Sequence, residues 1–260
     1  MALNPPINDW AGRRCWIVGA STGIGAALAE VLSAAGARLA LSSRRAVLLE
    51  GQATRLGADR TLAVPLDIRD AAGVKAGAQR IKAAWGGIDV VVLMAGDYKP
   101  MRAWEVDLEA AHSMIDTNLT GPFNVLAAVM PTLVTQGAGH LVLVSSVAGF
   151  RGLPKGLVYG PTKAALINLA ETLYLDLRPR GIAVSVVNPG FVRTPLTAQN
   201  DFEMPALIEP AEAAREIVAG LARGDFEMHF PRRFTRWLKL LRLLPYRLYF
   251  PAIRKMTGIK

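Results

Sequence analysis

Tyr159 and Lys163 stand four residues apart in the stretch VYGPTKAAL, residues 158–166. At this spacing two side chains share one face of a helix, and Pro161 is tolerated because it falls in the first turn. A phenol has a pKa of about 10 and exchanges protons poorly at neutral pH, but a neighbouring ammonium group favours the phenolate. The pair predicts an acid–base device or, alternatively, two unrelated side chains that share a helix face.

Two further polar residues precede this pair. Ser146 lies thirteen residues before Tyr159, after an apolar run, and Asn118 lies in the segment DTNLTG. A serine hydroxyl beside the phenol can donate a hydrogen bond to a carbonyl oxygen and stabilise the negative charge that develops there. The residues therefore predict a centre that moves a proton to or from such an oxygen, while a cofactor carries the redox step.

The glycine-rich segment GASTGIG, residues 19–25, follows an apolar run and leads into a helical pattern. Its glycines permit a tight turn and the close approach of a pyrophosphate, which the N-terminus of the following helix attracts. A glycine-rich loop before a helix is by itself a weak signal, and its position after the first predicted strand strengthens it. The predicted dinucleotide contacts are Gly19, Ser21, Thr22, Gly23, Ile24 and Gly25.

The residues after the second predicted strand indicate which dinucleotide is bound. An acidic residue there would bind the ribose 2′-hydroxyl of NAD, but the sequence reads SSRR at 42–45. A guanidinium group binds a 2′-phosphate in bidentate fashion, which favours NADP(H) over NAD(H), with Ser43 and Arg44 as contacts. Arg45 is predicted either to share this role or to be a solvated arginine at the start of a helix.

Short apolar runs alternate with helix-like segments, which predicts a doubly wound (Rossmann) α/β fold: one domain, a mostly parallel sheet and helices on both faces. Runs such as VVVLM and LVLV are apolar on both faces, as is typical of strands buried in such a sheet. A helix is expected over about 25–35. Strands are expected at 14–18, 38–42, 62–65, 89–94, 140–145, 183–187 and 226–230.

Small or polar residues follow each predicted strand, and ligands of such sheets bind beyond the carboxyl ends of the strands. Asp67, after the third strand, is predicted to accept a hydrogen bond from the adenine amino group. Its alternative role is to cap the next helix, although Asp70 is better placed for that.

Four motifs in register, GASTGIG, SSVAG, YGPTK and NPGFVRTP, resemble those of the short-chain dehydrogenase/reductase family, and the resemblance covers roughly residues 12–224. It implies an NADP(H)-dependent oxidoreductase that interconverts a secondary alcohol and a ketone or aldehyde. A protein that binds NADPH without turnover, as a regulator or a scaffold at a membrane surface, is the alternative.

The resemblance implies a catalytic tetrad of Asn118, Ser146, Tyr159 and Lys163. Lys163 would also hold the nicotinamide ribose, and Asn118 would support a water that relays protons to the lysine. Ser146 matches the family spacing to the tyrosine better than Ser145 does. The oxidised nicotinamide ring is a second cation, and with the lysine it is expected to lower the pKa of Tyr159 by about 3 units, or about 4 kcal/mol.

Further cofactor contacts are implied by the same resemblance, with Thr194 bonded to the nicotinamide carboxamide and Val192 offering its backbone. The segment Leu93-Met94-Ala95-Gly96 departs from the family's usual Asn-Asn-Ala-Gly and lacks two amide side chains. Thr22 replaces the basic residue that NADP-preferring relatives often carry, so Arg44 is expected to do most of the discrimination. The remaining predicted contacts are Ala95, Gly96, Pro189 and Gly190.

Composition limits the other possibilities. The single Cys15 permits no internal disulfide, and the three histidines have no metal-ligand spacing, so we expect no metal. The net charge of +9 resides in residues 228–260, with nine Lys or Arg and no acidic residue, and residues 1–227 are balanced. Nucleic acid binding is therefore not expected. Without a leader or an apolar run of about 18 residues, the chain is expected to be cytoplasmic, either free or at a membrane surface.

The chain is predicted to comprise an oxidoreductase domain, residues 1–227, and an amphipathic extension, residues 228–260. Residues 232–260 are predicted to lie on an anionic bilayer, to pack against another subunit, or to form a lid. The mostly apolar segment 195–210 suggests an apolar or lipid-like substrate. Apolar excess over 107–135 and 157–178 fits a homodimer or homotetramer, and packing within one chain explains it equally well. On a helical wheel the basic side of the extension holds Arg236, Lys239 and Arg242, and the apolar side holds Trp237, Leu240, Leu241 and Leu244.

Overall fold

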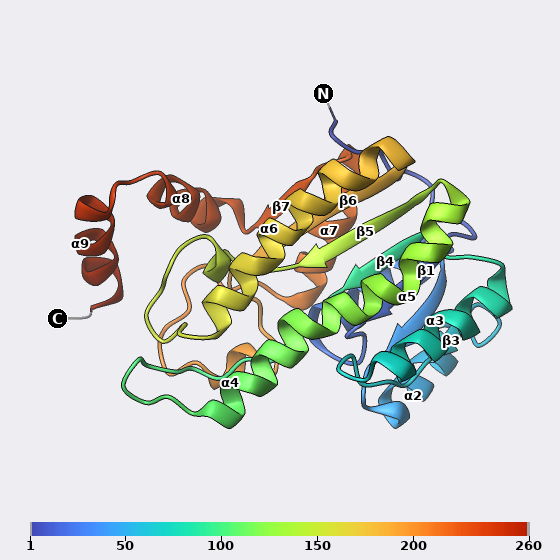
Figure 1. Ribbon diagram of the computed structural model, residues 1–260, viewed down its shortest axis with the longest axis horizontal. Helices are drawn as coiled ribbons and strands as arrows, with labels where there is room; N and C mark the ends of the chain where they lie inside the picture. The colour runs from blue at the N-terminus through green and yellow to red at the C-terminus, as the bar shows by residue number, and fades with distance from the viewer. Residues whose placement is uncertain (1, 259–260) are drawn as a thin grey trace.

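The computed structural model describes residues 2–258 as a central sheet with helices on both faces (Figure 1). The seven strands pair in parallel in the order β3-β2-β1-β4-β5-β6-β7, so the predicted fold class is confirmed. The strands are β1 (Arg14–Val18), β2 (Arg38–Ser42), β3 (Thr61–Ala63), β4 (Val90–Leu93), β5 (Gly139–Val144), β6 (Ile182–Pro189) and β7 (Glu227–Phe230).

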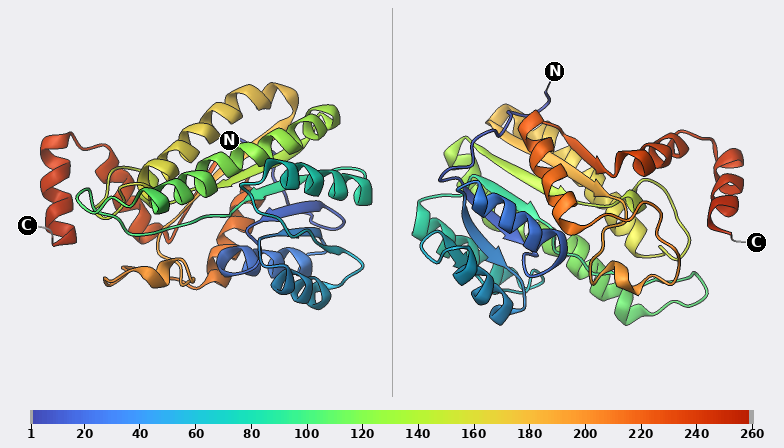
Figure 2. Two further views of the ribbon diagram at one scale, coloured as in Figure 1. Left: turned by 60° about the horizontal axis from the view of Figure 1, so that its bottom comes forward. Right: turned by 180° about the vertical axis from the view of Figure 1, so that it is seen from behind.

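Helices follow the strands and cover the two faces of the sheet (Figure 2). One face carries α1 (Gly23–Ala34), α2 (Ala46–Leu56) and α7 (Pro210–Arg223). The other face carries α3 (Ala71–Trp85), α5 (Gly121–Gln136) and α6 (Tyr159–Leu177). A short α4 (Leu108–Ile115) runs through a π-helical segment, Asp116–Thr120, into α5, and α8 (Arg232–Arg242) and α9 (Tyr246–Thr257) follow the last strand.

Alternation along the strands divides the core into two layers. In β1, Trp16 and Val18 pack with α3, α5 and α6, and Cys15 and Ile17 pack with α1, α2 and α7. Because successive side chains point to opposite faces, a strand covered on both sides must be apolar throughout. This is why the runs 15–18 in β1, 90–93 in β4 and 141–144 in β5 are apolar without interruption.

The strand bounds differ from the predicted ones where pairing decides them. β3 ends at Ala63, before Pro65, which has no N–H to donate to the ladder. β6 extends to Pro189 because its last residues pair with β7, with Pro189 opposite Phe230. The predicted boundary after residue 227 falls inside β7, so the segment that leaves the sheet begins after Phe230.

Gly25 sets the approach of α1 to the loop that precedes it. A Cβ built at Gly25 would collide with the carbonyl oxygen of Gly19, although the backbone of Gly25 is ordinary helix. Gly51 in α2 is also helical, yet a Cβ there would meet no atom within 4 Å. Gly25 is therefore required by close packing, whereas Gly51 shows only the intrinsic cost of glycine in a helix.

We expect Gly25→Ala to lower the free energy of unfolding by about 1 to 3 kcal/mol, because the loop and α1 must move apart. Gly51→Ala is the control and should raise it by about 0.5 to 1 kcal/mol, because alanine favours helix. Denaturant unfolding measures both. Equal effects of the two substitutions would contradict the close packing of α1.

Candidate active site

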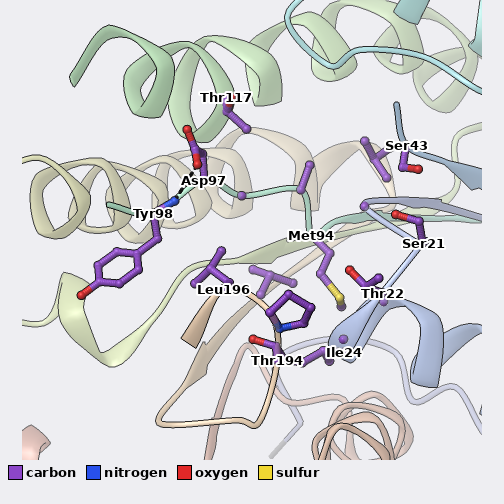
Figure 3. A pocket seen from close by; sticks show the side chains of 18 of the residues that line it. Ser21, Thr22, Ile24, Ser43, Met94, Asp97, Tyr98, Thr117, Thr194 and Leu196 are labelled. Carbon is purple, nitrogen blue, oxygen red and sulfur yellow. Dashed lines mark hydrogen bonds between the residues drawn. The ribbon is translucent and has the colours of Figure 1, made fainter. Parts of the chain in front are cut away.

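A cavity of about 480 Å³ lies beyond the carboxyl ends of the strands, where the sequence predicts the ligand site. At one end Figure 3 shows Tyr98, Asp97 and Leu196, and at the other Ser21 and Ser43. Every predicted cofactor residue except Asn118 lines this cavity, and so does Ser146. The lining includes Gly19, Ser21, Thr22, Gly23, Ile24, Gly25, Ser43, Arg44, Asp67, Ala95, Gly96, Ser146, Tyr159, Lys163, Pro189, Gly190, Val192 and Thr194.

The glycine-rich loop has the form needed to receive an anion. Gly19 adopts a φ of +102°, and a Cβ there would press on the backbone of Ala95, so only glycine fits. Thr22 precedes α1 without a side-chain hydrogen bond to the helix, and the first turn of α1 contains no acidic residue. The N–H groups of this turn and the positive end of the helix dipole are therefore available to a phosphate.

Two arginines lie at the end of the cavity near β2. Arg44 lines the cavity, as predicted from its position after Ser43. The Arg45 guanidinium also lines it and donates hydrogen bonds to the hydroxyls of Ser21, at 2.7 Å, and Thr22, at 2.8 Å. Arg45 is exposed at the start of α2 and its guanidinium contacts the glycine-rich loop, so a phosphate contact and a solvated arginine at a helix start both remain predictions for it.

Asp67 lines the cavity, but its carboxylate is bound by the guanidinium of its neighbour Arg69, with an Nη2–Oδ2 distance of 2.7 Å. This hydrogen bond holds the pKa of Asp67 below its usual range. Asp70 caps α3 by accepting from the N–H of Ala72 at 3.0 Å. The capping role therefore falls to Asp70, as its spacing indicated, and the contact of Asp67 with the adenine amino group stays a prediction.

Tyr159, Lys163 and Ser146 converge on the other end of the cavity. Tyr159 and Lys163 lie in the first turns of α6, and the Lys163 Nζ lies 5.6 Å from the centre of the Tyr159 ring. Ser146 follows β5 and its Oγ accepts from the N–H of Ala148 at 3.1 Å. That bond occupies a lone pair of the oxygen, so the Ser146 O–H can still donate, and the Tyr159 phenol lies within its reach. Ser145 points elsewhere and donates to the Lys163 carbonyl at 2.6 Å.

Burial disfavours the charged forms of both Lys163 and Tyr159. Lys163 is 4% exposed, and removal from water lowers the pKa of its ammonium group to about 8. The Nζ donates to the Val144 carbonyl at 3.0 Å. Tyr159 keeps some exposure at the cavity wall, yet burial raises the pKa of its phenol to about 12, and a hydrogen bond with Ser146 opposes this rise.

The expected decrease in the pKa of Tyr159 is therefore not a property of the protein chain alone. Desolvation of the phenol prevails, and the ammonium of Lys163 is itself weakened by burial. The second cation invoked by that expectation belongs to the cofactor. At neutral pH the chain by itself holds Tyr159 as a protonated phenol.

Asn118 lies behind the cavity wall and is fully buried. Its Oδ1 accepts from the N–H of Asp97 at 2.7 Å, and its Nδ2 donates to the Asp97 carbonyl at 2.8 Å and to Thr162 at 3.2 Å. The side chain thus ties the segment after β4 to α6. Asn118 lies on a π-helical turn, and the water relay to Lys163 that was predicted for it stays a prediction.

The remaining predicted contacts lie where strands β4 and β6 end. A Cβ at Gly96 would lie 3.7 Å from the Lys163 Nζ, so the backbone after β4 runs directly past the lysine. Thr194 packs over the glycine-rich loop: a Cβ at Gly23 would lie 2.9 Å from its methyl group. The Val192 carbonyl is occupied, because it accepts from the Thr197 hydroxyl at 2.6 Å.

Sequence reasoning did not single out Tyr98. Its ring packs edge-on against Tyr159 with 4.9 Å between the ring centres, and its hydroxyl donates to the Asn200 Oδ1 at 2.9 Å. Leu196 lies in the same part of the cavity. Only the folded chain brings the segment after β4 and the segment around residue 200 together, and the position of Tyr98 two residues after Gly96 was the one available signal.

The chain is similar to a known protein family along most of its length. A family model described as short chain dehydrogenase matches residues 13–204. An oxidoreductase of Myxococcus xanthus, described as uncharacterized, is 37% identical over 247 residues, which are 94% of this chain and 97% of the relative. An oxidoreductase of Staphylococcus aureus strain USA300, with the same description, is 30% identical over 207 residues, 80% of this chain and 90% of the relative.

Two solved structures share the fold. A short chain dehydrogenase/reductase from Burkholderia phymatum in complex with NAD superposes with a TM-score of 0.83 at 23% identity, covering 90% of this chain and 94% of that one. A short-chain dehydrogenase from Streptomyces avermitilis superposes with a TM-score of 0.81 at 27% identity, covering 96% and 99%.

We expect the burial of Lys163 to make stability depend on pH. The folded pKa of about 8 lies below the ordinary lysine value of 10.5, so the unfolded chain binds more protons between these values and the free energy of unfolding rises with pH there. Lys163→Met removes this contribution. The free energy of unfolding of Lys163→Met minus that of the wild type should therefore decrease by about 2 to 3 kcal/mol between about pH 7 and about pH 10.

Denaturant unfolding at the two pH values measures this difference. Lys75→Met, at an exposed position on α3, is the matched control and should shift stability equally at both. A constant difference between wild type and Lys163→Met would show that the buried ammonium is not disfavoured.

Proposed function

We propose that this chain, which belongs to the short-chain dehydrogenase family, is an NADP(H)-dependent oxidoreductase that interconverts a secondary alcohol and a ketone or aldehyde. The observation that carries the proposal is one cavity lined at one end by Ser146, Tyr159 and Lys163 and at the other by Arg44 and Arg45. The first group suits proton transfer and the second suits a phosphate, so the cavity fits a dinucleotide between them.

The cofactor, when bound, supplies or accepts the hydride. The protein has to hold the substrate oxygen and move a proton to or from it. Tyr159 is the proposed acid and base, because its phenol is protonated and lies at the cavity wall within hydrogen-bonding reach of Ser146. During reduction the phenol gives its proton to the oxygen, and Ser146 donates a hydrogen bond to the same atom and stabilises its growing negative charge.

Lys163 is proposed to bind the cofactor and also to take part in proton transfer through Tyr159. One of its three donor hydrogens goes to the Val144 carbonyl, so two remain for the nicotinamide ribose and for the proton path through Tyr159. A pKa of about 8 keeps the ammonium mostly charged at neutral pH, yet close enough to deprotonation to take part in a relay. Asn118 is proposed to support this relay, with its side chain fixing the π-helical turn.

The preference for NADP(H) is proposed from the hydroxyl and guanidinium groups at the β2 end of the cavity. Arg44 and Arg45 supply positive charge, and Ser43, Ser21 and Thr22 supply hydroxyl donors. A 2′-phosphate can bind several of these donors at once, whereas a 2′-hydroxyl needs none of the charge. Asp67 is proposed to accept from the adenine amino group at the same end.

The substrate is proposed to be apolar or lipid-like. Tyr98 and Leu196 line the cavity near Tyr159 and present mostly apolar surface to a bound molecule. Two carboxylates lie near Tyr98, and both are engaged: Asp97 accepts from the Tyr98 N–H at 2.9 Å and from the Ser113 hydroxyl at 2.8 Å, and Asp201 pairs with Lys155. An uncharged carbonyl compound therefore suits this end better than an ionic one.

We expect Tyr159→Phe to lower kcat for NADPH-dependent reduction by about 100-fold or more while NADPH affinity is kept, because only the acid is removed. Tyr98→Phe removes a hydroxyl from the same cavity and should cost less than about 10-fold. NADPH oxidation with a panel of ketones and aldehydes measures both. Bound NADPH with no turnover of any compound in the panel would favour the catalytically silent alternative.

We expect Arg44→Ala and Arg45→Ala each to weaken NADPH binding by about 10- to 100-fold and to leave NADH binding nearly unchanged. Arg38→Ala, at the exposed start of β2 and far from its carboxyl end, is the control and should change neither. Fluorescence titration with both coenzymes gives the ratio. Equal losses for NADPH and NADH would contradict a 2′-phosphate site at this position.

A further inference from the structure

Helices α8 and α9 leave the sheet after β7 and project from the body of the molecule at one end (Figures 1 and 2). Large apolar side chains remain exposed along both helices, from 53% for Met256 to 80% for Leu243. The full set is Trp237, Leu240, Leu243, Tyr246, Leu248, Phe250 and Met256, which we call the C-terminal apolar set. Such a concentration over about 20 residues is unusual for a surface in contact only with water.

Basic side chains accompany the apolar set on the same two helices. The segment 231–258 contains no Asp or Glu. Lys239 pairs with Glu227 of β7 at its Nζ, and the other basic residues of the helices are exposed. These are Arg232, Arg233, Arg236, Arg242, Arg247, Arg254 and Lys255, which we call the C-terminal basic set.

The helices are held firmly to the domain, so their exposed side chains are not those of a frayed end. Leu238 of α8 is part of the main core, and the Tyr249 hydroxyl of α9 donates to the Gly152 carbonyl at 2.8 Å. Arg151 donates to the Leu244 carbonyl at 2.6 Å, and its guanidinium lies 3.9 Å from the centre of the Tyr249 ring. The α8–α9 junction is therefore fixed to the segment that leads into α6.

The packing of α8 agrees only in part with the apolar and basic sides predicted from the helical wheel. Of its apolar side, Leu241 turns toward the core, whereas Trp237 and Leu240 face outward, 69% and 56% exposed. The outward face of α8 thus mixes tryptophan and leucine with arginine. An aromatic side chain among arginines suits the boundary between lipid headgroups and acyl chains, where apolar rings and cationic groups are both stabilised.

We propose that α8 and α9 form a docking surface for an anionic lipid bilayer. The apolar set would enter the boundary between headgroups and acyl chains, and the basic set would pair with anionic headgroups. Within residues 2–258 no helix is long and apolar enough to cross a bilayer, so the contact lies on the membrane surface. A second copy of the chain is the competing occupant, and a two-fold contact of these helices with each other would set the basic set against itself with no acidic residue in 231–258 to balance it.

Vesicle sedimentation with the full-length protein tests the charge requirement. Binding to vesicles of equal parts phosphatidylserine and phosphatidylcholine should exceed binding to phosphatidylcholine alone by about 10-fold or more, and should weaken as salt rises from about 0.1 M to about 1 M. The triple substitution Arg236→Glu, Arg247→Glu and Arg254→Glu should abolish the difference.

The triple substitution Lys75→Glu, Arg80→Glu and Lys82→Glu is the matched control. It makes the same change in net charge at exposed positions on α3 and should retain vesicle binding. Circular dichroism confirms that both variants are folded. Equal loss in the two variants, or equal binding to neutral and anionic vesicles, would overturn the proposal.

Tryptophan quenching locates the contact on the molecule. Vesicles with brominated acyl chains should quench the protein's fluorescence, and Trp237→Phe should remove most of this quenching while vesicle binding persists. Trp104 is 75% exposed outside the two helices, so Trp104→Phe should leave the quenching unchanged. Quenching that depends on Trp104 and not on Trp237 would overturn the assignment.

The oligomeric mass of the same variants, measured without lipid, tests whether the two helices instead contact a second copy of the chain. The proposal expects the oligomeric mass to be the same for the wild type and for both charge variants. If wild type binds no vesicles and the helix variants alone change the mass, the two helices are a subunit interface and the lipid proposal is wrong.

Discussion

A parallel sheet covered by helices on both faces buries both sides of its strands, so the groups that can meet a ligand gather where the strands end. In β1, alternate residues enter separate apolar layers, so both faces of the strand are committed to packing. All seven strands run in one direction, which brings their carboxyl ends to one edge. The glycine-rich loop, the arginines after β2 and the serine after β5 share a cavity because each follows the carboxyl end of a strand.

Within that cavity the burial of two ionisable groups sets the chemistry. The pocket disfavours both the ammonium of Lys163 and the phenolate of Tyr159, so the chain alone keeps the tyrosine as an acid. Ser146 partly offsets this effect by hydrogen bonding to the phenol. A positively charged ring bound beside the phenol, as proposed for the oxidised coenzyme, would shift the balance toward phenolate and so would couple the state of the coenzyme to the proton affinity of Tyr159.

The C-terminal helices extend the domain without adding to the cavity. Their inward residues, such as Leu238, continue the core, and Arg151 fixes the junction between them by bonding to carbonyls at the end of α8. Arg151 lies eight residues before Tyr159, so the surface presented by α8 and α9 and the proposed reacting centre are connected through one short segment. An apolar substrate and a bilayer contact are consistent with each other, although each proposal stands on its own residues.

The amino-acid sequence determined the fold class, most strand positions and the residues that gather at the ligand edge. Buried parallel strands appear as short apolar runs and the turns after them as small or polar residues, and both signals are local in the sequence. β1 and β2 have the predicted bounds, and the i, i+4 spacing of Tyr159 and Lys163 places both on α6. Only the tertiary structure decided the contacts between distant segments. The bond from Arg45 to Ser21, the packing of Tyr98 on Tyr159 and the outward turn of Trp237 each depend on which surfaces meet, and burial, which sets the pKa of Tyr159 and Lys163, is a property of the folded chain.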